Sequence, residues 1–333
     1  MSDLFNSSSD KLDVTKKNIE RLDRHQTELF ESRTVLIREF CSAALSCAEK
    51  EAPLFDKLRE AYSSAAFARN FYEAREISKA EGARSFFASL SAIEKLEFCR
   101  ELIKASGISA SADQILAYAD DSPAPDPILS ESRGRIAYMK NNFTESAFLK
   151  FSKVVANSRS AYLQSFDAVC EEVYSGRCEY CILPIESSSE GRLSSFYSMI
   201  DRYELKIATV CTVEQHDSQR FTKFALLKKS IVASSLLRTI GSNGILEFKV
   251  SSATGSIGSP DRDNSPVCDI LLAASASGMR LLSIDSMPLP YNDEMTAYYI
   301  SLAFDGSLPT AFLLYITLEF PQFDPLGVYF AVN

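Results

Sequence analysis

A short apolar run at residues 181–185 constrains the fold of this chain more than any other feature. Such a run is typical of a strand that is buried on both faces, as in a parallel sheet between helices. It leads into a polar loop, and an amphipathic helical pattern begins at Gly191. A helix N-terminus that follows a buried strand and a hydroxyl-rich loop directs free backbone N–H groups at the loop. The sequence therefore predicts an anion-binding corner there.

Further strands and helices are expected on both sides of this run. Strands are predicted at 135–139, 203–213 and 224–227, and a helix at 144–151. Strands that alternate with helices indicate a parallel sheet of the α/β class. From residue 244 the pattern changes to strand 246–250, helix 266–276, strands 279–284 and 298–304, helix 308–318 and strand 327–332, which is the ferredoxin-like order. Because Glu247 and Lys249 alternate with apolar residues, strand 246–250 is expected to be half exposed.

The N-terminal part is predicted to be all-α. Residues 14–50 contain no Pro or Gly and carry apolar residues at helical spacing, and residues 71–106 are helical by the same criterion. Arg33 falls on the apolar stripe, so it either forms a salt bridge to another helix or binds a carboxylate. The acidic, proline-rich residues 120–127 indicate a linker. We therefore expect a helical domain at 1–120, a linker at 121–132, an α/β domain at 133–240 and an α+β ferredoxin-like domain at 241–333.

Charge and cysteine content exclude several classes of function. The net charge of −9 argues against nucleic acid or an anionic membrane as a partner, and no apolar run is long enough to span a bilayer. The N-terminal segment lacks a secretory signal, so the cysteines are interpreted as reduced thiols and the protein as cytoplasmic. Cys178 and Cys181 have no second ligand pair, so we interpret them as one surface and one core thiol. No metal and no cofactor is expected.

Two short motifs resemble those of prephenate dehydratases. The run ILPIESSSEG at 182–191 resembles the Pro-Ile-Glu-Asn motif of that family, and FTKFALL at 221–227 resembles its Thr-Arg-Phe motif. Residues 133–148, RGRIAYMKNNFTESAF, resemble the segment that opens the family's domain. Ser187 stands in place of the family's Asn, and Lys223 in place of its Arg. The resemblance implies a two-lobed, periplasmic-binding-protein-like α/β domain with the site in the cleft between the lobes.

The resemblance also implies residue roles. Thr222 is expected to be the proton donor when prephenate is converted to phenylpyruvate, CO₂ and water. The substrate-binding residues that it implies are Thr144, Glu186, Ser187, Ser188, Ser189, Lys223 and Phe224. The alternative is a catalytically inactive paralogue that binds an aromatic acid or regulates an active enzyme, because a retained fold does not fix function.

The two flanking parts resemble domains that accompany prephenate dehydratases. Residues 16–36 resemble the first helix of all-helical chorismate mutases, which implies Lys16 and Arg33 as chorismate-binding cations; weak or absent mutase activity is expected because Ala44 replaces a lysine. Residues 241–333 resemble the ACT regulatory domain, which implies a homo-oligomer with phenylalanine bound at a dimer interface. The positions matched to its effector site are Val267, Asp285, Ser286 and Pro288.

Overall fold

A computed structural model describes most of the chain. The described residues are 2–47, 54–67, 90–106, 112–119, 132–214, 220–231, 243–253, 266–289, 292–320 and 322–332. They group into two compact units, Met1–Ser109 and Ala110–Asn333. Within these described residues, none of the helices has both the length and the apolar character that crossing a membrane requires.

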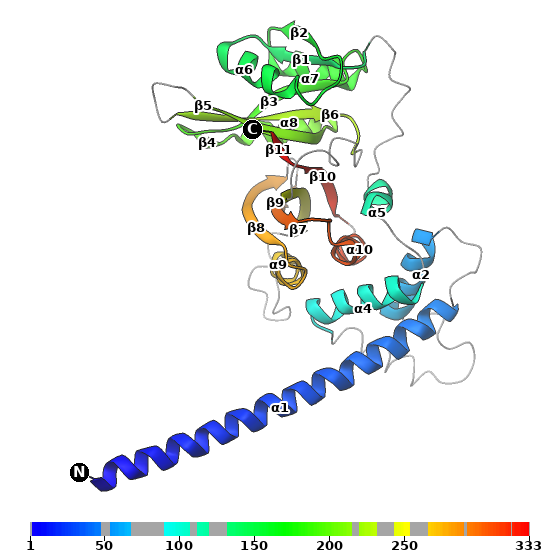
Figure 1. The fold of residues 1–333 in the computed structure, drawn as a ribbon. Coiled ribbons are helices and arrows are strands. Elements are labelled where there is room, and N and C mark those ends of the chain that lie inside the picture. The colour runs from blue at the N-terminus through cyan, green and yellow to red at the C-terminus, as the bar shows by residue number, and fades with distance from the viewer. Residues whose placement is uncertain are drawn as a thin grey trace. The chain divides into compact units, whose positions relative to one another are not determined.

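The first unit consists of helices. Helix α1 (Ser2–Cys47) confirms the long N-terminal helix and begins earlier than expected, and it is followed by α2 (Leu54–Phe67) and α4 (Ala92–Ala105) (Figure 1). Helix α4 starts at Ser91, whose side chain forms a capping box with Glu94. Of the helical stretch expected at 71–106, residues 71–89 lie outside the described residues. Helices α2 and α4 both pack on α1, and Phe98 of α4 contacts Cys41 of α1 and Tyr62 of α2. The buried apolar residues of the three helices include Ile37, Cys41, Leu58, Tyr62, Leu96, Phe98 and Leu102.

The second unit contains an α/β sheet, which we call sheet A. Its main strands are β1 (Arg135–Met139), β2 (Arg159–Leu163), β3 (Tyr180–Ser187), β5 (Lys206–Glu214), β6 (Phe221–Lys228) and β11 (Ala331–Val332). Their order is β11-β5-β6-β3-β1-β2, and the short strand β4 (Gly191–Arg192) pairs with β3. Strand β6 is antiparallel to both neighbours, so the expected parallel sheet is in fact mixed.

Helices cover both faces of sheet A. Helix α6 (Asn142–Phe151) packs on one face, and Phe151 and Ala147 contribute to the core there. Helices α7 (Phe166–Tyr174) and α8 (Ser194–Tyr203) pack on the other face through Val169, Phe196 and Ile200. Because helices lie on both sides, the apolar run of β3 is buried on both faces, as the sequence predicted.

The expectation of two lobes is wrong for the described residues. Between 132 and 231, all strands belong to the single sheet A, and the segment 215–219, which joins β5 to β6, is the stretch left undescribed. Strands β5 and β6 are hydrogen-bonded neighbours, so this short segment connects adjacent strands of one sheet. The described residues between 132 and 231 therefore form one sheet with its covering helices. They provide no second lobe that could close a cleft.

The remaining strands form the ferredoxin-like sheet B. It contains β7 (Asn243–Ala253), β8 (Arg280–Leu289), β9 (Asn292–Asp305) and β10 (Asp324–Tyr329), in the antiparallel order β10-β7-β9-β8. Helices α9 (Pro266–Ala276) and α10 (Thr310–Glu319) complete the strand–helix–strand–strand–helix–strand sequence. Helix α5 (Ala112–Ala119) packs on α10 and β10, so it joins this unit rather than the N-terminal helices.

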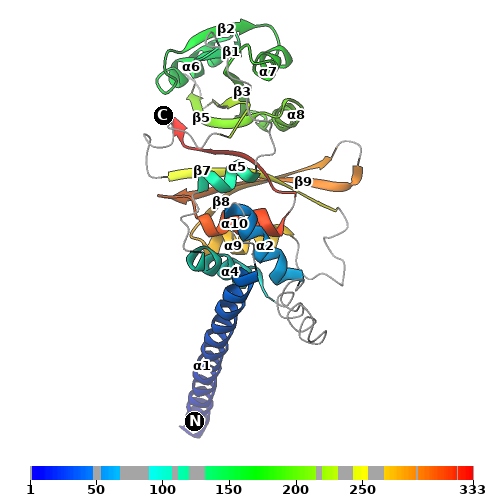
Figure 2. The same ribbon diagram turned by 90° about the vertical axis from the view of Figure 1, so that its right-hand side faces the viewer.

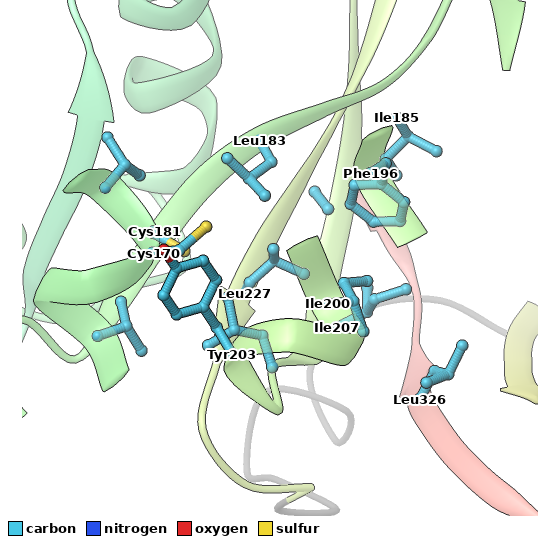
Figure 3. Packing of buried hydrophobic residues seen from close by; sticks show 14 of the residues in the cluster. Cys170, Cys181, Leu183, Ile185, Phe196, Ile200, Tyr203, Ile207, Leu227 and Leu326 are labelled. Atoms are coloured by element: carbon cyan, nitrogen blue, oxygen red, sulfur yellow. The ribbon is translucent and has the colours of Figure 1, made fainter. Parts of the chain in front are cut away.

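The central strands of sheet B are covered on both faces, whereas outward-facing residues of its edge strand β8 are exposed. Figure 2 shows sheet B between the α/β part and helices α9 and α10. Tyr299 of β9 and Leu326 of β10 belong to the same core as Ile200 and Ile207 of the α/β part, and Figure 3 shows Leu326 beside the side chains of that core. The prediction of a half-exposed β7 is therefore wrong, because Glu247 is 1 % exposed. The face of β7 that carries Glu247 packs against the α/β part instead of facing water.

The C-terminal strand also differs from the prediction. Residues expected as one strand at 327–332 divide into β10 in sheet B and β11 in sheet A. Strand β11 pairs with β5 through Ala331 and Val332, so the chain end covers the edge of sheet A. A side chain at Gly327 would lie 2.6 Å from the carbonyl oxygen of Ile207, so glycine permits this close crossing.

Candidate functional site

The topology of sheet A locates its switch point. From β1 the chain crosses to β2 on one side, whereas from β3 it continues towards β5 on the other side. In open α/β sheets, ligands bind outside the carboxyl ends of two strands whose connections diverge in this way. The switch point here lies between the turn at Lys140 and Asn141 after β1 and the loop 187–191 after β3.

The two motifs meet at this edge. Ser187 on β3 lies opposite Thr222 on β6, and Glu186 lies opposite Lys223. Phe224, two residues beyond Thr222, is buried in the core under α6, so Thr222 and Ser187 share the α6 face. Lys223 and Glu186 therefore point to the opposite face. The expected donor and the expected carboxylate-binding cation do not converge on one side of the sheet, and Phe224 acts as a core residue.

Serine hydroxyl groups hold the loop after β3 through hydrogen bonds within the loop and to Phe221. The Ser187 hydroxyl accepts from the backbone N–H of Glu190 at 3.1 Å and lies 3.2 Å from the Ser189 hydroxyl. The Ser188 hydroxyl accepts from the N–H of Phe221 at 3.1 Å, and the N–H of Ser188 donates to the Phe221 carbonyl. Ser188 and Ser189 are exposed. The loop is thus held in place by its own serines, while Thr222 and Lys223 have no side-chain partner among the described residues.

Thr144 has a structural role at the start of α6. Its hydroxyl accepts from the N–H of Asn141 and donates to the Met139 carbonyl, while its own N–H donates to the Asn141 side chain at 2.9 Å. This is a capping box, and the Thr144 side chain is buried at 1 % exposure. A ligand would have to break these bonds to reach the hydroxyl, so its expected contact with substrate remains a prediction that the cap opposes.

The carboxyl edge of sheet A also carries residues that the sequence motifs did not identify. The Lys140 ammonium lies 5.0 Å from the centre of the Tyr162 ring, and Tyr162 packs edge-on against Tyr138. Hydrogen bonds from Ser160 and Tyr138, together with the nearby Lys140, lower the pKa of Tyr162. Both Lys140 and Tyr162 are exposed, so the edge offers a cation beside an aromatic ring. Only the parallel pairing of β1 with β2 brings these residues together.

Three of the four expected effector positions lie on strand β8 and divide between the two faces of sheet B, and the fourth lies in helix α9. Asp285 lies opposite Tyr299 in the register of β8 and β9, so it faces the α/β part, where it pairs with Arg192. Ser286 and Pro288 point to the other face and are exposed, and Val267 lies in the first turn of α9. The expected phenylalanine contact at these positions stays a prediction, and Asp285 is already engaged in an ion pair.

The mutase-like cations lie far apart on α1. Lys16 and Arg33 are separated by 17 residues of helix, which is about 25 Å along the axis. Lys16 is exposed, whereas Arg33 pairs with Glu94 of α4 at 2.5 Å. Of the two interpretations that the sequence left open for Arg33, the structure has the salt bridge to another helix. One small molecule cannot contact both cations within a single chain.

The Cys178 and Cys181 pair is buried as a whole. Cys178 is 2 % exposed and Cys181 is fully buried, so the expectation of a surface thiol at Cys178 is wrong. Desolvation raises the pKa of Cys178 to about 11 and the pKa of Cys181 well above its usual value. Among the described residues, no group of His, Cys, Asp or Glu side chains is arranged to hold a metal ion.

Comparisons with known proteins agree with the motifs. Residues 139–230 match the family model for prephenate dehydratase. A comparison with curated protein sequences gave no match. Among solved structures, prephenate dehydratase from Streptococcus mutans is 16 % identical with a TM-score of 0.46, and the match covers 60 % of this chain and 99 % of that one. The Arthrobacter aurescens enzyme in complex with L-Phe is 14 % identical with a TM-score of 0.43, covering 59 % and 89 %. A protein described as GqqA, a quorum quenching acylase, is 18 % identical with a TM-score of 0.44, covering 59 % and 94 %.

Proposed function

We propose that this protein binds a small aromatic carboxylate at the carboxyl edge of sheet A and does not convert it. The observation that carries the proposal is the single sheet formed by the described residues between 132 and 231. Proton transfer from a neutral threonine hydroxyl needs a dry, closed site, because water would compete for every hydrogen bond. An edge with exposed Ser188 and Ser189 supports binding better than it supports this chemistry.

The ligand class follows from the groups at the edge. Lys140 supplies positive charge in an otherwise acidic chain, and α6 begins at the same edge with its first backbone N–H groups. Tyr162 offers an exposed ring beside Lys140. A carboxylate near Lys140 and an aromatic ring against Tyr162 would satisfy both kinds of group. Phenylpyruvate has this combination, and prephenate carries two carboxylates on a cyclohexadiene ring of similar size.

Dehydration of prephenate is the second candidate. The match of residues 139–230 to the prephenate dehydratase family and the pairing of Ser187 with Thr222 favour it. In this alternative, Thr222 donates a proton to the departing ring hydroxyl while CO₂ leaves, giving phenylpyruvate and water. The protein would then belong to phenylalanine biosynthesis. The alternative requires Thr222 and Lys223 to serve one substrate from opposite faces of β6.

A paired assay separates the two candidates. Purified full-length protein is mixed with prephenate at neutral pH, and phenylpyruvate is followed by absorbance against the spontaneous background. Calorimetry with prephenate, phenylpyruvate and phenylalanine is run on the same preparation. We expect no phenylpyruvate above background and measurable binding of prephenate or phenylpyruvate, weakened severalfold in Lys140→Met and unchanged in Lys153→Met.

Each candidate has an outcome that excludes it. Turnover above background that is lost in Thr222→Val would establish the dehydratase and exclude the binding proposal. Turnover that appears in the double variant Ser187→Asn, Lys223→Arg but not in the natural sequence would show a weakened catalytic site rather than a binding site. Absence of heat with all three compounds would exclude the binding proposal.

A further inference from the structure

A buried polar network joins loop 187–191 to the ferredoxin-like half. Arg192 of β4 directly follows the loop, and its Nη1 donates to Ser283 and Asp285 of β8. Its Nη2 donates to Glu247 of β7 at 3.2 Å. The guanidinium carbon lies 5.3 Å from the centre of the Tyr197 ring. One side chain thus reaches two strands of sheet B from the end of the loop.

Glu247 is the buried centre of this network. Its carboxylate accepts from Arg192, from the Tyr197 hydroxyl at 2.9 Å and from the Tyr329 hydroxyl. A buried carboxylate is tolerated only when it is paired and hydrogen-bonded, and these three donors come from three different elements. Burial and the charge of Glu247 raise the pKa of Tyr197 and of Tyr329, so both remain neutral donors. The position of Arg192 is therefore fixed by sheet B.

The other side of Arg192 is fixed to the loop. Strand β4 pairs with β3 through Arg192 and Glu186 and through Gly191 and Ser187. The N–H of Leu193, the next residue, donates to the Ile185 carbonyl at 2.8 Å. A displacement of Arg192 along strand β4 would therefore also move Gly191 and the serines that precede it.

We propose that Arg192 is a positioning residue that couples the ferredoxin-like half to the ligand loop. Asp285 is the accessible member of the network, since its side chain is 32 % exposed on the edge strand β8 while that of Glu247 is 1 % exposed. An event that draws Asp285 away from Arg192 leaves the guanidinium with only Glu247 and the Ser283 hydroxyl as hydrogen-bond partners and loosens loop 187–191. The effect on ligand affinity rests on the proposed function, whereas the effect on loop order does not.

Hydrogen exchange of backbone amides tests the coupling without a ligand. The amides to follow are those of Ser188, Glu190 and Leu193, which donate to Phe221, Ser187 and Ile185. We expect Asp285→Asn to speed their exchange at least about fivefold in the folded full-length protein. Ser286→Ala is the matched control, because this neighbour points to the other face of β8. It should leave the three amides unchanged.

Variants at Arg192 distinguish positioning from general support. Arg192→Met should speed exchange in the loop more than Asp285→Asn does, and Arg192→Lys should restore part of the protection because it keeps the charge without the planar fork. If Arg192→Met fails to fold, Asp285→Asn and Arg192→Lys still decide the question. Faster exchange that is uniform over sheets A and B, or confined to β8 and β9, would overturn the proposal.

A binding measurement then tests the functional consequence. The dissociation constant of phenylpyruvate is measured by calorimetry for natural protein, Asp285→Asn and Ser286→Ala. We expect it to rise at least about threefold in Asp285→Asn only. An unchanged constant together with a loosened loop would show that the coupling stops short of the ligand. If natural protein does not bind phenylpyruvate, the proposed function fails, while the exchange result still decides whether Arg192 couples the two parts.

Discussion

Ser187 and Thr222 lie directly opposite each other on the antiparallel strands β3 and β6, on the face of the sheet that α6 covers. Their neighbours Glu186 and Lys223 form the next register pair on the other face. The carboxyl edge of sheet A therefore presents hydroxyl groups on one side and charged groups on the other. This separation is a further physical reason, besides the single sheet, to expect binding rather than dehydration there.

Removing the cap of α6 should destabilise the protein. Asn141→Ala eliminates the acceptor for the Thr144 N–H and should lower the free energy of unfolding by about 1 kcal/mol. The neighbouring Asn142→Ala lies in the first helical turn without a capping bond among the described residues and serves as the control. Urea denaturation of both variants measures the difference. An equal decrease of the free energy of unfolding in the two variants would contradict the capping role of Asn141.

Filling the space at Gly327 should weaken the contact between the two sheets. An alanine methyl group would lie 2.6 Å from the Ile207 carbonyl oxygen and 2.8 Å from the Ile207 Cβ. We expect Gly327→Ala to cost about 1–3 kcal/mol, as overpacking usually does. Gly327 is not among the described glycines with a positive φ, so backbone strain adds nothing to this cost. Thermal unfolding followed by circular dichroism compares the variant with natural protein, and wild-type stability in Gly327→Ala would refute the close crossing.

The contribution of Lys228 to the stability of the protein should rise between about pH 8 and pH 9.5. Burial lowers the pKa of Lys228 to about 8, which the charge of Glu179 only partly offsets. In this range Lys228 of the unfolded chain still holds the proton that the folded protein has released, so its contribution to the free energy of unfolding increases with pH. Buried cysteines with a raised pKa act in the opposite direction in the same range, and tyrosines with a raised pKa do so above about pH 10, so the Lys228 contribution is measured as a difference between variants.

Replacing Lys228 tests this source of the pH dependence. Lys228→Met should raise stability at pH 7, since the burial cost of the charge is removed, and its advantage over natural protein should shrink between pH 8 and pH 9.5. Lys153→Met, an exposed lysine, should leave the profile unchanged. Urea denaturation at half-unit pH intervals measures both. A profile for Lys228→Met that matches natural protein would assign the pH dependence to another group.

Thiol labelling should divide the described cysteines into two classes. Cys268 is exposed on α9 and should react with a thiol reagent within minutes in native buffer. Cys170, Cys178 and Cys181 are buried, and burial raises the pKa of Cys178 and Cys181, so their thiolates are scarce at pH 8. Mass spectrometry of the labelled peptides measures the rates. Fast labelling of Cys178 would contradict its burial under α7.

The helical unit should lack chorismate mutase activity. Arg33 is held by Glu94, and Lys16 is about 25 Å away along the same helix. Arg33→Ala should cost at most about 1 kcal/mol of stability, because the ion pair is partly exposed, and Arg21→Ala should cost nothing measurable. Loss of chorismate is followed by absorbance. Turnover in natural protein that disappears in Arg33→Ala would show that Arg33 serves a substrate.

The sequence by itself determined the local elements. Strand β1 coincides with the predicted 135–139, and α9 begins at Pro266 and ends before Gly278, whose φ of +75° suits a helix C-terminus. The long helix α1 followed from the absence of Pro and Gly. These features depend on propensity and hydrophobic period within a few residues, which a single sequence records directly. The motifs at 182–191 and 221–227 were likewise visible from residue types alone.

The tertiary structure decided which faces these elements bury and which residues meet. Glu247 alternates with apolar residues like a solvent-facing side chain, yet it is buried, because the alternation shows only that two faces differ and not what covers each. The link from Arg192 to Asp285 joins residues 93 positions apart, and β11 returns to pair with β5. Such long-range pairings depend on how two sheets pack on each other. A local pattern of residues carries no record of that packing.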